Sequence, residues 1–383
     1  MTTLLSTLTA ASAHATGPVA DAVPALTRDL LAGLAGRSAG AVVWFASSAY
    51  APGDLAAPIA QAFPGVPVLG CSTAGEFTQG GTGTGGVSAV ALPEGVVVRA
   101  AAALGDLSAD VATGTDAAVA DLEARLGAPL RSLDPARHLL LVLIDGMHGV
   151  EELVNERLGN AAPALDVVGG SAGDDLAFAS TWVAVGDRVS DHGVALLLLE
   201  TGVPFRVVKT CSFVPAGRVL RITKADVPNR VVLELDGRPA VEAYADAVGC
   251  APDEVDAAQF MAHPVGLMMD GQAWIRSPRA VVEGGGLAFY AQILEGMDVE
   301  LMNATDMVAE TRSAVTAAVA DLGGTSGGAV MFNCILRRLQ MDAEGTGGRF
   351  VESFGGIPLA GFHTYGETWL GHVNQTLTGV VFG

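Results

Sequence analysis

The chain contains 383 residues with a formal net charge of −20 at pH 7; half of the residues are hydrophobic and 16% are charged. This length allows two domains with a large buried core, and the composition argues against a disordered protein. The negative charge argues against a nucleic-acid partner, because the neutralisation of phosphates requires clustered Lys and Arg. Since no apolar run reaches the roughly 20 residues that cross a bilayer, we expect no membrane partner either.

The N-terminal segment 1–34 is predicted to be helical. Apolar residues recur at steps of three and four across 18–36, which is the spacing of an amphipathic helix. The first residues lack the basic start and the continuous apolar run of a signal peptide, so we reject a secretory leader. The four cysteines lie far apart and form no CxxC pair, which predicts free thiols and a cytoplasmic location.

One short pattern occurs three times, at 68–76, 168–174 and 359–367. Each copy runs from an apolar strand through small residues to a glycine and a carboxylate, and further apolar strands precede and follow it. Repetition at this scale indicates repeated structural units. We therefore predict an α/β fold of mixed sheets with helices on their outer faces, built from repeated strand–helix–strand–turn–hairpin units. We also expect the three turns to gather in one place.

Two hairpins and one loop complete this prediction. Strands 87–92 and 96–102 are separated by a short turn sequence, as are strands 194–199 and 205–211, and both patterns are typical of hairpins. The glycine tract 80–86 predicts a flexible loop. It is followed by a strand and lacks the Lys of a phosphate-binding loop.

Cys71 lies at the first glycine turn but lacks the surroundings of a catalytic nucleophile. A nucleophile elbow requires G-x-S-x-G, and a cysteine nucleophile requires a partner base, neither of which the neighbouring sequence supplies. We therefore predict a protein that is not an enzyme. The alternative is a cysteine-dependent enzyme that uses Cys71 or Cys334, which requires a thiol with a depressed pKa.

The third copy differs from the other two because it is rich in rings and hydrogen-bond donors. His363 and His372 lie in and beside it, and either imidazole is a candidate axial ligand of haem. Arginines of the same region offer a planar fork for a carboxylate or a haem propionate. The alternative is that these polar side chains satisfy one another's hydrogen bonds. The predicted ligand-binding residues are Arg276, Asn333, Cys334, Arg337, His363, Tyr365, Glu367 and Asn374.

These motifs, taken together and in order, resemble the FIST sensory family. The N-terminal region, 35–217, carries Gly70-Cys71-Ser72-Thr73-Ala74-Gly75-Glu76 and Gly169-Gly170-Ser171-Ala172-Gly173-Asp174. The C-terminal region, 218–383, carries Leu235-Asp236-Gly237-Arg238-Pro239-Ala240, His263-Pro264 and Gly361-Phe362-His363-Thr364-Tyr365-Gly366-Glu367.

The resemblance implies a cytoplasmic sensor that binds a small ligand. The chain departs from the many multidomain members because it carries no kinase, methyl-acceptor or GGDEF-like segment, so we expect a stand-alone sensor that signals through a partner protein. Some members resemble haem-based nitric-oxide sensors of the NosP type, which work with a histidine kinase or with a cyclic-di-GMP enzyme, either a diguanylate cyclase or a phosphodiesterase. Haem b is therefore the candidate cofactor. An amino-acid sensor without haem is the alternative.

Overall fold

The computed structural model describes residues 8–269 and 271–383 of the chain. All three copies of the repeat lie in the first of two compact units. The predicted regions 1–34, 35–217 and 218–383 are divisions of the sequence into family regions rather than compact units, and they stay a prediction. The first unit contains the chain up to Lys209, Thr311–Gly371 and Leu377–Gly383, and the second contains Thr210–Glu310 and His372–Thr376.

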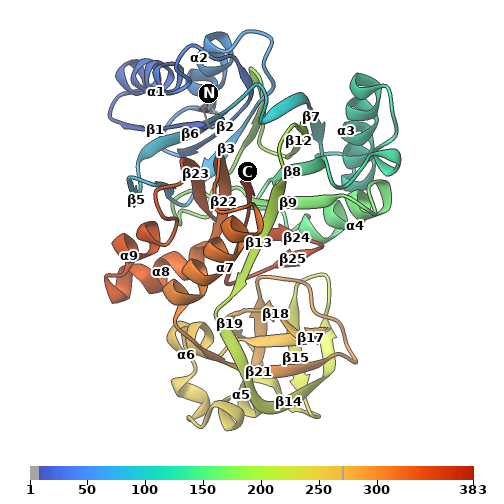
Figure 1. Ribbon diagram of the computed structural model, residues 1–383. Coiled ribbons are helices and arrows are strands. Elements are labelled where there is room, and N and C mark those ends of the chain that lie inside the picture. Colours follow the sequence, from blue (N-terminus) through green and yellow to red (C-terminus); the bar gives the residue numbers. More distant parts are fainter. Residues whose placement is uncertain (1–7, 270) are drawn as a thin grey trace. The chain divides into compact units, whose positions relative to one another are not determined.

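The predicted fold class is confirmed, because the chain forms mixed sheets with helices on their outer faces (Figure 1). Each copy of the repeat builds two parallel strands and a third strand antiparallel to the first of them. In the first copy these are β2 (Ala39–Ser47), β3 (Val68–Thr73) and β6 (Gly86–Pro93). In the second they are β8 (His138–Ile144), β9 (Asp166–Ser171) and β12 (Gly193–Thr201), and in the third β22 (Gly328–Cys334), β23 (Leu359–Thr364) and β26 (Thr376–Phe382).

The strand after each turn leaves its own copy and joins the sheet of another. β4 (Glu76–Thr78) follows the first turn and pairs with β23 of the third copy. β10 (Val183–Val185) follows the second turn and pairs with β3 of the first copy. β24 (Glu367–Trp369) follows the third turn and pairs with β9 of the second copy. This cyclic exchange ties the copies together, because each sheet is completed by a strand from another copy.

The two predicted hairpins are wrong. β7 (Val97–Asp106) pairs with β12 of the second copy rather than with β6, and β13 (Phe205–Cys211) lies beside β26 of the third copy rather than beside β12. The glycine tract is ordered as well, since β5 (Gly81–Gly83) pairs with β4. The last strand of the first sheet is β11 (Arg188–Ser190), which pairs with β10.

The N-terminal segment predicted to be helical is part strand. β1 (Ala11–Thr16) pairs with β6 at the edge of the first sheet. It occupies the same edge position that β7 occupies beside β12 in the second copy and that β13 occupies beside β26 in the third. The predicted helix follows as α1 (Val19–Gly33). Residues 1–7 of the segment lie outside the described residues.

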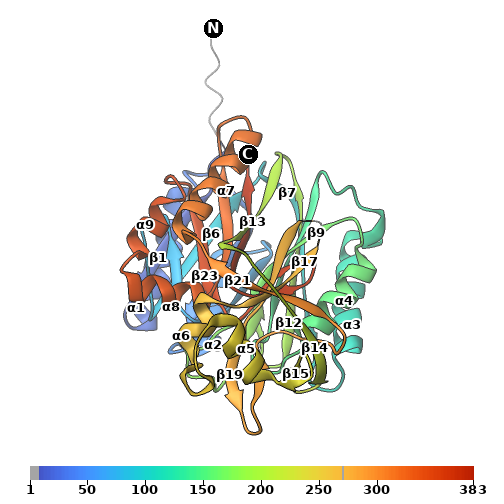
Figure 2. The same cartoon turned by 90° about the horizontal axis from the view of Figure 1, so that it is seen from below.

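Helices cover the outer faces of the sheets, while the inner faces share one apolar core. Phe45, Phe332 and Phe362 of the first and third copies are in ring contact there, with centroids between 4.6 and 6.1 Å apart. Both faces of these strands are buried, which explains their nearly continuous apolar sequences. The outer helices are α1 and α2 (Pro52–Ala62) on the first sheet, α3 (Val111–Leu126) and α4 (Glu151–Ala161) on the second, and α8 (Ile335–Glu344) and α9 (Gly347–Glu352) in the third copy (Figures 1 and 2). A short helix, η1 (Leu130–Ser132), precedes β8.

The second unit is built on one sheet and two short helices, with Tyr244 and Phe260 in its apolar core. The helix α7 (Met307–Asp321) carries the chain back to the first unit. Within the described residues, no helix combines the length and the apolar character that a bilayer span requires. In spatial order the strands are β18 (Gln272–Arg276), β17 (Val265–Met269), β21 (Asp298–Ala304), β14 (Phe213–Asp226), β15 (Val231–Leu235), β20 (Gly286–Phe289) and β19 (Pro278–Val282), with β16 (Arg238–Pro239) beside β15. The remaining elements are α5 (Ala240–Val248), η2 (Pro252–Glu254), α6 (Ala257–Ala262) and β25 (His372–Val373).

Candidate functional site

The three glycine turns meet in the first unit, as predicted, and their backbones hydrogen-bond in a closed ring. A Cβ on Gly173 would lie 2.6 Å from the backbone nitrogen of Ala74, so only glycine lets the second turn approach the first this closely. The shared glycine therefore serves the architecture. The bonds that close the ring run from His363 N to Gly75 O (2.8 Å), from Ser171 N to Gly366 O (2.8 Å) and from Gly173 N to Ser72 O (3.1 Å).

A hydroxyl three residues before the carboxylate is a second shared feature of the first and third turns. Thr73 Oγ1 donates to Glu76 Oε1, and Thr364 Oγ1 donates to Glu367 Oε1 at 2.7 Å. Both glutamates are fully buried. Burial raises the pKa of Glu76 from 4.5 to about 8, against the lowering effect of the hydrogen bond from Thr73. Glu76 therefore holds a proton at neutral pH.

His363 lies in a buried relay of hydrogen bonds. Arg337 Nε donates to Asn333 Oδ1 (2.8 Å), which leaves the amide nitrogen of Asn333 to donate to His363 Nδ1 (2.9 Å). The other ring nitrogen, Nε2, therefore carries the proton and donates to Thr82 Oγ1 (3.1 Å). Burial, and then the charges of Arg338 and Arg337, lowers the pKa of His363 to about 3, so the ring is neutral. Thr82 belongs to β5, and this bond helps to order the glycine tract.

This relay does not fit His363 as an axial ligand of haem. Iron requires a ring nitrogen with an available lone pair, whereas Nδ1 accepts from Asn333 and Nε2 carries a proton. Arg337 is 1% exposed and also donates from Nη2 to Thr311 Oγ1 (2.7 Å), so its guanidinium faces the interior. Cys334 is equally buried, at the start of α8. These contacts favour a structural role for the relay.

Tyr365 joins the third turn to the loop that follows the second. Its hydroxyl donates to Asp174 Oδ1 and accepts from Leu176 N (3.0 Å), and its ring stacks on Phe178 with centroids 5.0 Å apart. Burial raises the pKa of Tyr365 far above its usual value. Asp175, Leu176 and Phe178 have φ angles of 54°, 69° and 50°, a strained conformation that these contacts hold in place.

Three of the predicted site residues lie in the second unit. Arg276 Nη1 donates to the backbone oxygen of His372 (2.9 Å), and His372 Nε2 lies 3.4 Å from Asn374 Nδ2. Thus the predicted residues are divided between the two units, and their roles in ligand binding stay predictions. The members of the set in the first unit are Asn333, Cys334, Arg337, His363, Tyr365 and Glu367.

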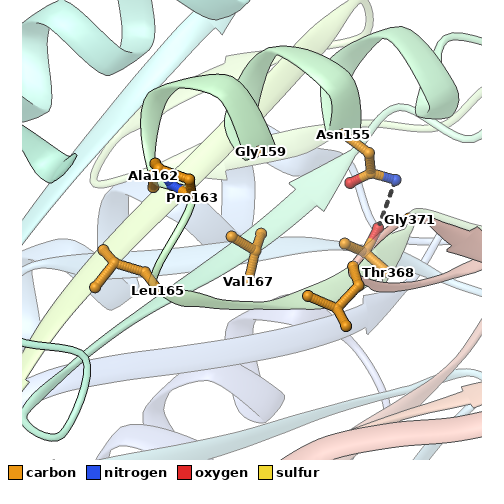
Figure 3. A pocket seen from close by; sticks show the side chains of 9 residues that line it. Asn155, Gly159, Ala162, Pro163, Leu165, Val167, Thr368 and Gly371 are labelled. Carbon is orange, nitrogen blue, oxygen red and sulfur yellow. Dashed lines mark hydrogen bonds between the residues drawn. The ribbon is translucent and has the colours of Figure 1, made fainter.

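A small pocket of the first unit lies between α4, β9 and β24 and has a volume of ≈ 160 Å³ (Figure 3). Asn155 of α4 places its amide nitrogen 3.4 Å from Thr368 Oγ1. Its amide oxygen is buried and has no hydrogen-bond partner among the residues that the structure describes. Figure 3 shows this oxygen on the side of the amide that faces away from Thr368. The rest of the wall is mainly apolar and comprises Gly159, Ala162, Pro163, Leu165, Val167, Leu370 and Gly371.

Comparison with known proteins identifies the family. The model of the FIST N domain matches residues 40–238 and that of the FIST C domain matches residues 240–369. The chain belongs to the FIST family. FIST domains are sensory domains of signalling proteins that bind small ligands, and they are sensors rather than catalytic domains.

Two curated relatives of this FIST chain are uncharacterized proteins of Mycobacterium bovis and Mycobacterium tuberculosis. Each is 28% identical over 250 residues, which cover 61% of this chain and 63% of the relative. The matched part thus spans less than two thirds of the length of these relatives.

Sequence reasoning missed the residues that line the pocket of this FIST protein. Asn155 lies on α4 and Thr368 follows the predicted turn, and neither residue belongs to a motif of its own. The sequence did contain a signal for the buried hydroxyl–carboxylate pairs of the first and third turns, because a Thr lies three residues before Glu76 and three residues before Glu367.

Proposed function

We propose that this FIST protein is a sensor whose small polar ligand binds in the pocket between α4, β9 and β24. The observation that carries the proposal is the buried amide oxygen of Asn155, which has no hydrogen-bond partner within the described part of the chain. A buried acceptor without a donor costs about 1–3 kcal/mol, so a ligand that supplies an N–H or O–H group recovers that free energy.

The size of the pocket limits the ligand class. A volume of ≈ 160 Å³ lies below the roughly 300–1,000 Å³ of pockets that bind drug-sized ligands. This space suits a ligand of a few non-hydrogen atoms, such as a small amino acid or a short amine, and it is far too small for haem. The apolar wall formed by Leu165 and Val167 favours a short aliphatic part beside the donor group.

The pocket also suggests how binding is transmitted. Leu370 and Gly371 line it and are the last residues of the first unit before the chain enters the second at His372. Leu370 is 67% exposed and has a φ angle of 53°, which is unfavourable for a residue with a side chain. A ligand that contacts this segment selects among its conformations, and we propose that a histidine kinase, a diguanylate cyclase or a phosphodiesterase responds to that change in the cytoplasm.

Haem b remains the rival ligand, with His372 as the axial candidate because its ring is not part of the relay around His363. Bound haem would supply an iron that binds nitric oxide. A Soret band in protein expressed with added haem, lost in His372→Ala, would support this rival. Protein that stays colourless with added haem would exclude it.

A thermal-shift assay tests the proposed pocket with glycine, L-alanine, L-serine and ethanolamine as probes. Saturation at about a hundredfold excess over the dissociation constant stabilises the native state by about 2.7 kcal/mol. Asn155→Leu removes the acceptor, and Gly159→Leu fills the pocket from a position where an added Cβ meets no atom within 4 Å. The control is Asn160→Leu, an exposed position on the same helix. A shift that is lost in the first two variants and kept in the control supports the proposal, whereas no shift in the unmodified chain, or equal shifts in all four proteins, contradicts it.

A further inference from the structure

A pair of histidines lies at one end of the second sheet and does not line the pocket. The end of β8, which leads into the loop that carries one of them, also contacts the second turn, because Ala172 N donates to Ile144 O (2.8 Å). His148 lies in the loop after β8, and His192 lies directly before β12. Their ring centroids are 4.0 Å apart with an interplanar angle of 35°. Each side chain is 43% exposed, so both rings are open to solvent along part of their surface.

A carboxylate fixes the proton of each ring. His148 Nδ1 contacts Asp145 Oδ2, and His192 Nδ1 lies 3.2 Å from Asp191 Oδ1. Because an ionised carboxylate only accepts hydrogen bonds, each Nδ1 carries the proton and each Nε2 keeps its lone pair in the neutral ring.

The backbone holds the two rings next to each other. The amide of Asp145 donates to Gly193 O (3.0 Å), and Leu107 N donates to His192 O (2.7 Å). Asp145 is 1% exposed and also accepts from Thr181 Oγ1 (2.7 Å). The pair is therefore held by adjacent strands and a buried carboxylate, so its geometry does not depend on surface side chains alone.

We propose that His148 and His192 form a binding site for a late first-row divalent cation, with Cu²⁺, Ni²⁺ and Zn²⁺ as the class of ligand. Imidazole nitrogen is a preferred donor for these ions, and a metal-bound histidine usually donates its second ring N–H to a carboxylate, as both rings do here. An ion bound in the plane of both rings lies about 3.2 Å from each ring centroid, so a square-planar or tetrahedral angle at the ion requires centroids about 4.5–5.2 Å apart. The centroids are 4.0 Å apart in the structure, so the two half-exposed rings must move apart by about 0.5–1.2 Å when the ion binds.

The site is open to exchange. Among residues 8–269 and 271–383, no group of three or more His, Cys, Asp or Glu side chains is placed to hold one metal ion. Two imidazoles therefore supply the protein ligands, and water or an exogenous donor completes the coordination. Asp106, which interacts with His192, and Asp191 add negative charge that favours a cation.

The equivalent strand ends of the other copies carry no such pair. β2 is followed by Ser48-Ala49-Tyr50, and β22 runs directly into α8. The histidine pair is thus a departure from the repeat in the second copy, and the shared architecture does not require it.

Titration of tag-free protein with Cu²⁺, followed by calorimetry and electron paramagnetic resonance, tests the site. We expect one Cu²⁺ per chain with two nitrogen ligands, competition by Zn²⁺, no competition by Mg²⁺, and weaker binding as the pH falls because protons compete for the lone pairs. His148→Gln and His192→Gln should each weaken binding by at least about 10- to 100-fold, because loss of an outer-shell partner alone has an effect of that size. The control is His138→Gln, at the opposite end of β8, where Nδ1 contacts the backbone oxygen of Asp134 (2.9 Å).

Three results would overturn the proposal that the two histidines bind one metal ion. They are the absence of saturable Cu²⁺ binding, unchanged binding in both variants, and loss in only one of them, since a shared site requires both rings. Thermal unfolding of each variant without metal shows whether it is folded. A variant that fails to fold is replaced by its alanine counterpart, and the spectrum of the unmodified chain still reports whether two nitrogens bind the ion.

Discussion

The buried carboxyl of Glu76 makes the stability of the chain depend on pH in a specific way. Its folded pKa of about 8 lies above the value of 4.5 expected in the unfolded chain. Between these values the native state holds a proton that the unfolded chain has released, so raising the pH favours unfolding. The contribution of Glu76 to stability is complete below pH 4.5 and is lost progressively up to pH 8.

The magnitude follows from the size of the shift. At 1.36 kcal/mol per pH unit, the loss reaches about 3 kcal/mol at pH 7 and about 5 kcal/mol above pH 8. Glu76→Gln removes this dependence. The amide oxygen of the variant keeps the hydrogen bond from Thr73, but its nitrogen no longer accepts from Gly86 N (3.3 Å), which costs about 1 kcal/mol at every pH.

Urea unfolding at constant ionic strength from pH 5 to pH 8 measures this difference. We expect the unmodified chain to be more stable than Glu76→Gln near pH 5 and less stable at pH 8, with the difference changing by about 1.4 kcal/mol per pH unit. The exposed Glu352 provides the control, because Glu352→Gln removes a carboxyl group without removing a buried proton. Parallel stability curves for the unmodified chain and Glu76→Gln would refute the reasoning.

Three further outcomes follow from the same contacts. Gly159→Ala should stabilise the chain by about 0.5–1 kcal/mol in urea unfolding, because alanine favours the helix and its Cβ meets no atom within 4 Å; a loss of stability would show that the position is crowded. Tyr365→Phe should cost about 1–3 kcal/mol in the same assay, because it leaves the buried Asp174 without the phenolic donor, and no change would mean that the contact is dispensable. Cys71 is fully buried, and burial followed by the charge of Glu76 raises its thiol pKa well above the usual value. It should therefore resist alkylation in the native protein while the partly exposed Cys211 reacts; rapid labelling of Cys71 would support the cysteine-dependent enzyme.

The sequence predicted the strands because most are buried on both faces and read as continuous apolar runs, as 139–144 does. It did not predict their partners. Neighbours in sequence usually pair, and the short link between 87–92 and 96–102 favoured a hairpin. In the fold that link instead carries the chain from the first sheet to the second, and no local pattern encodes such an exchange.

In the candidate site, too, sequence motifs identified single residues but not the partners that the fold brings to them. His363 was identified from its setting in the third turn, but its partner Thr82 lies in a glycine tract 281 residues away, and only the fold brings them together. Asn155 gave no signal, because a polar residue on an amphipathic helix is expected to face water. The repeated Thr before Glu76 and Glu367 was readable and would have predicted buried hydroxyl–carboxylate pairs.

Calorimetric titration of the pocket tests the proposed sensor most directly. The probe is whichever of glycine, L-alanine, L-serine and ethanolamine raises the melting temperature most, and the proteins are the unmodified chain, Gly159→Leu and Asn160→Leu. We predict binding of one molecule per chain, lost in Gly159→Leu and retained in Asn160→Leu. Binding that persists in Gly159→Leu would place the ligand elsewhere and contradict the proposal.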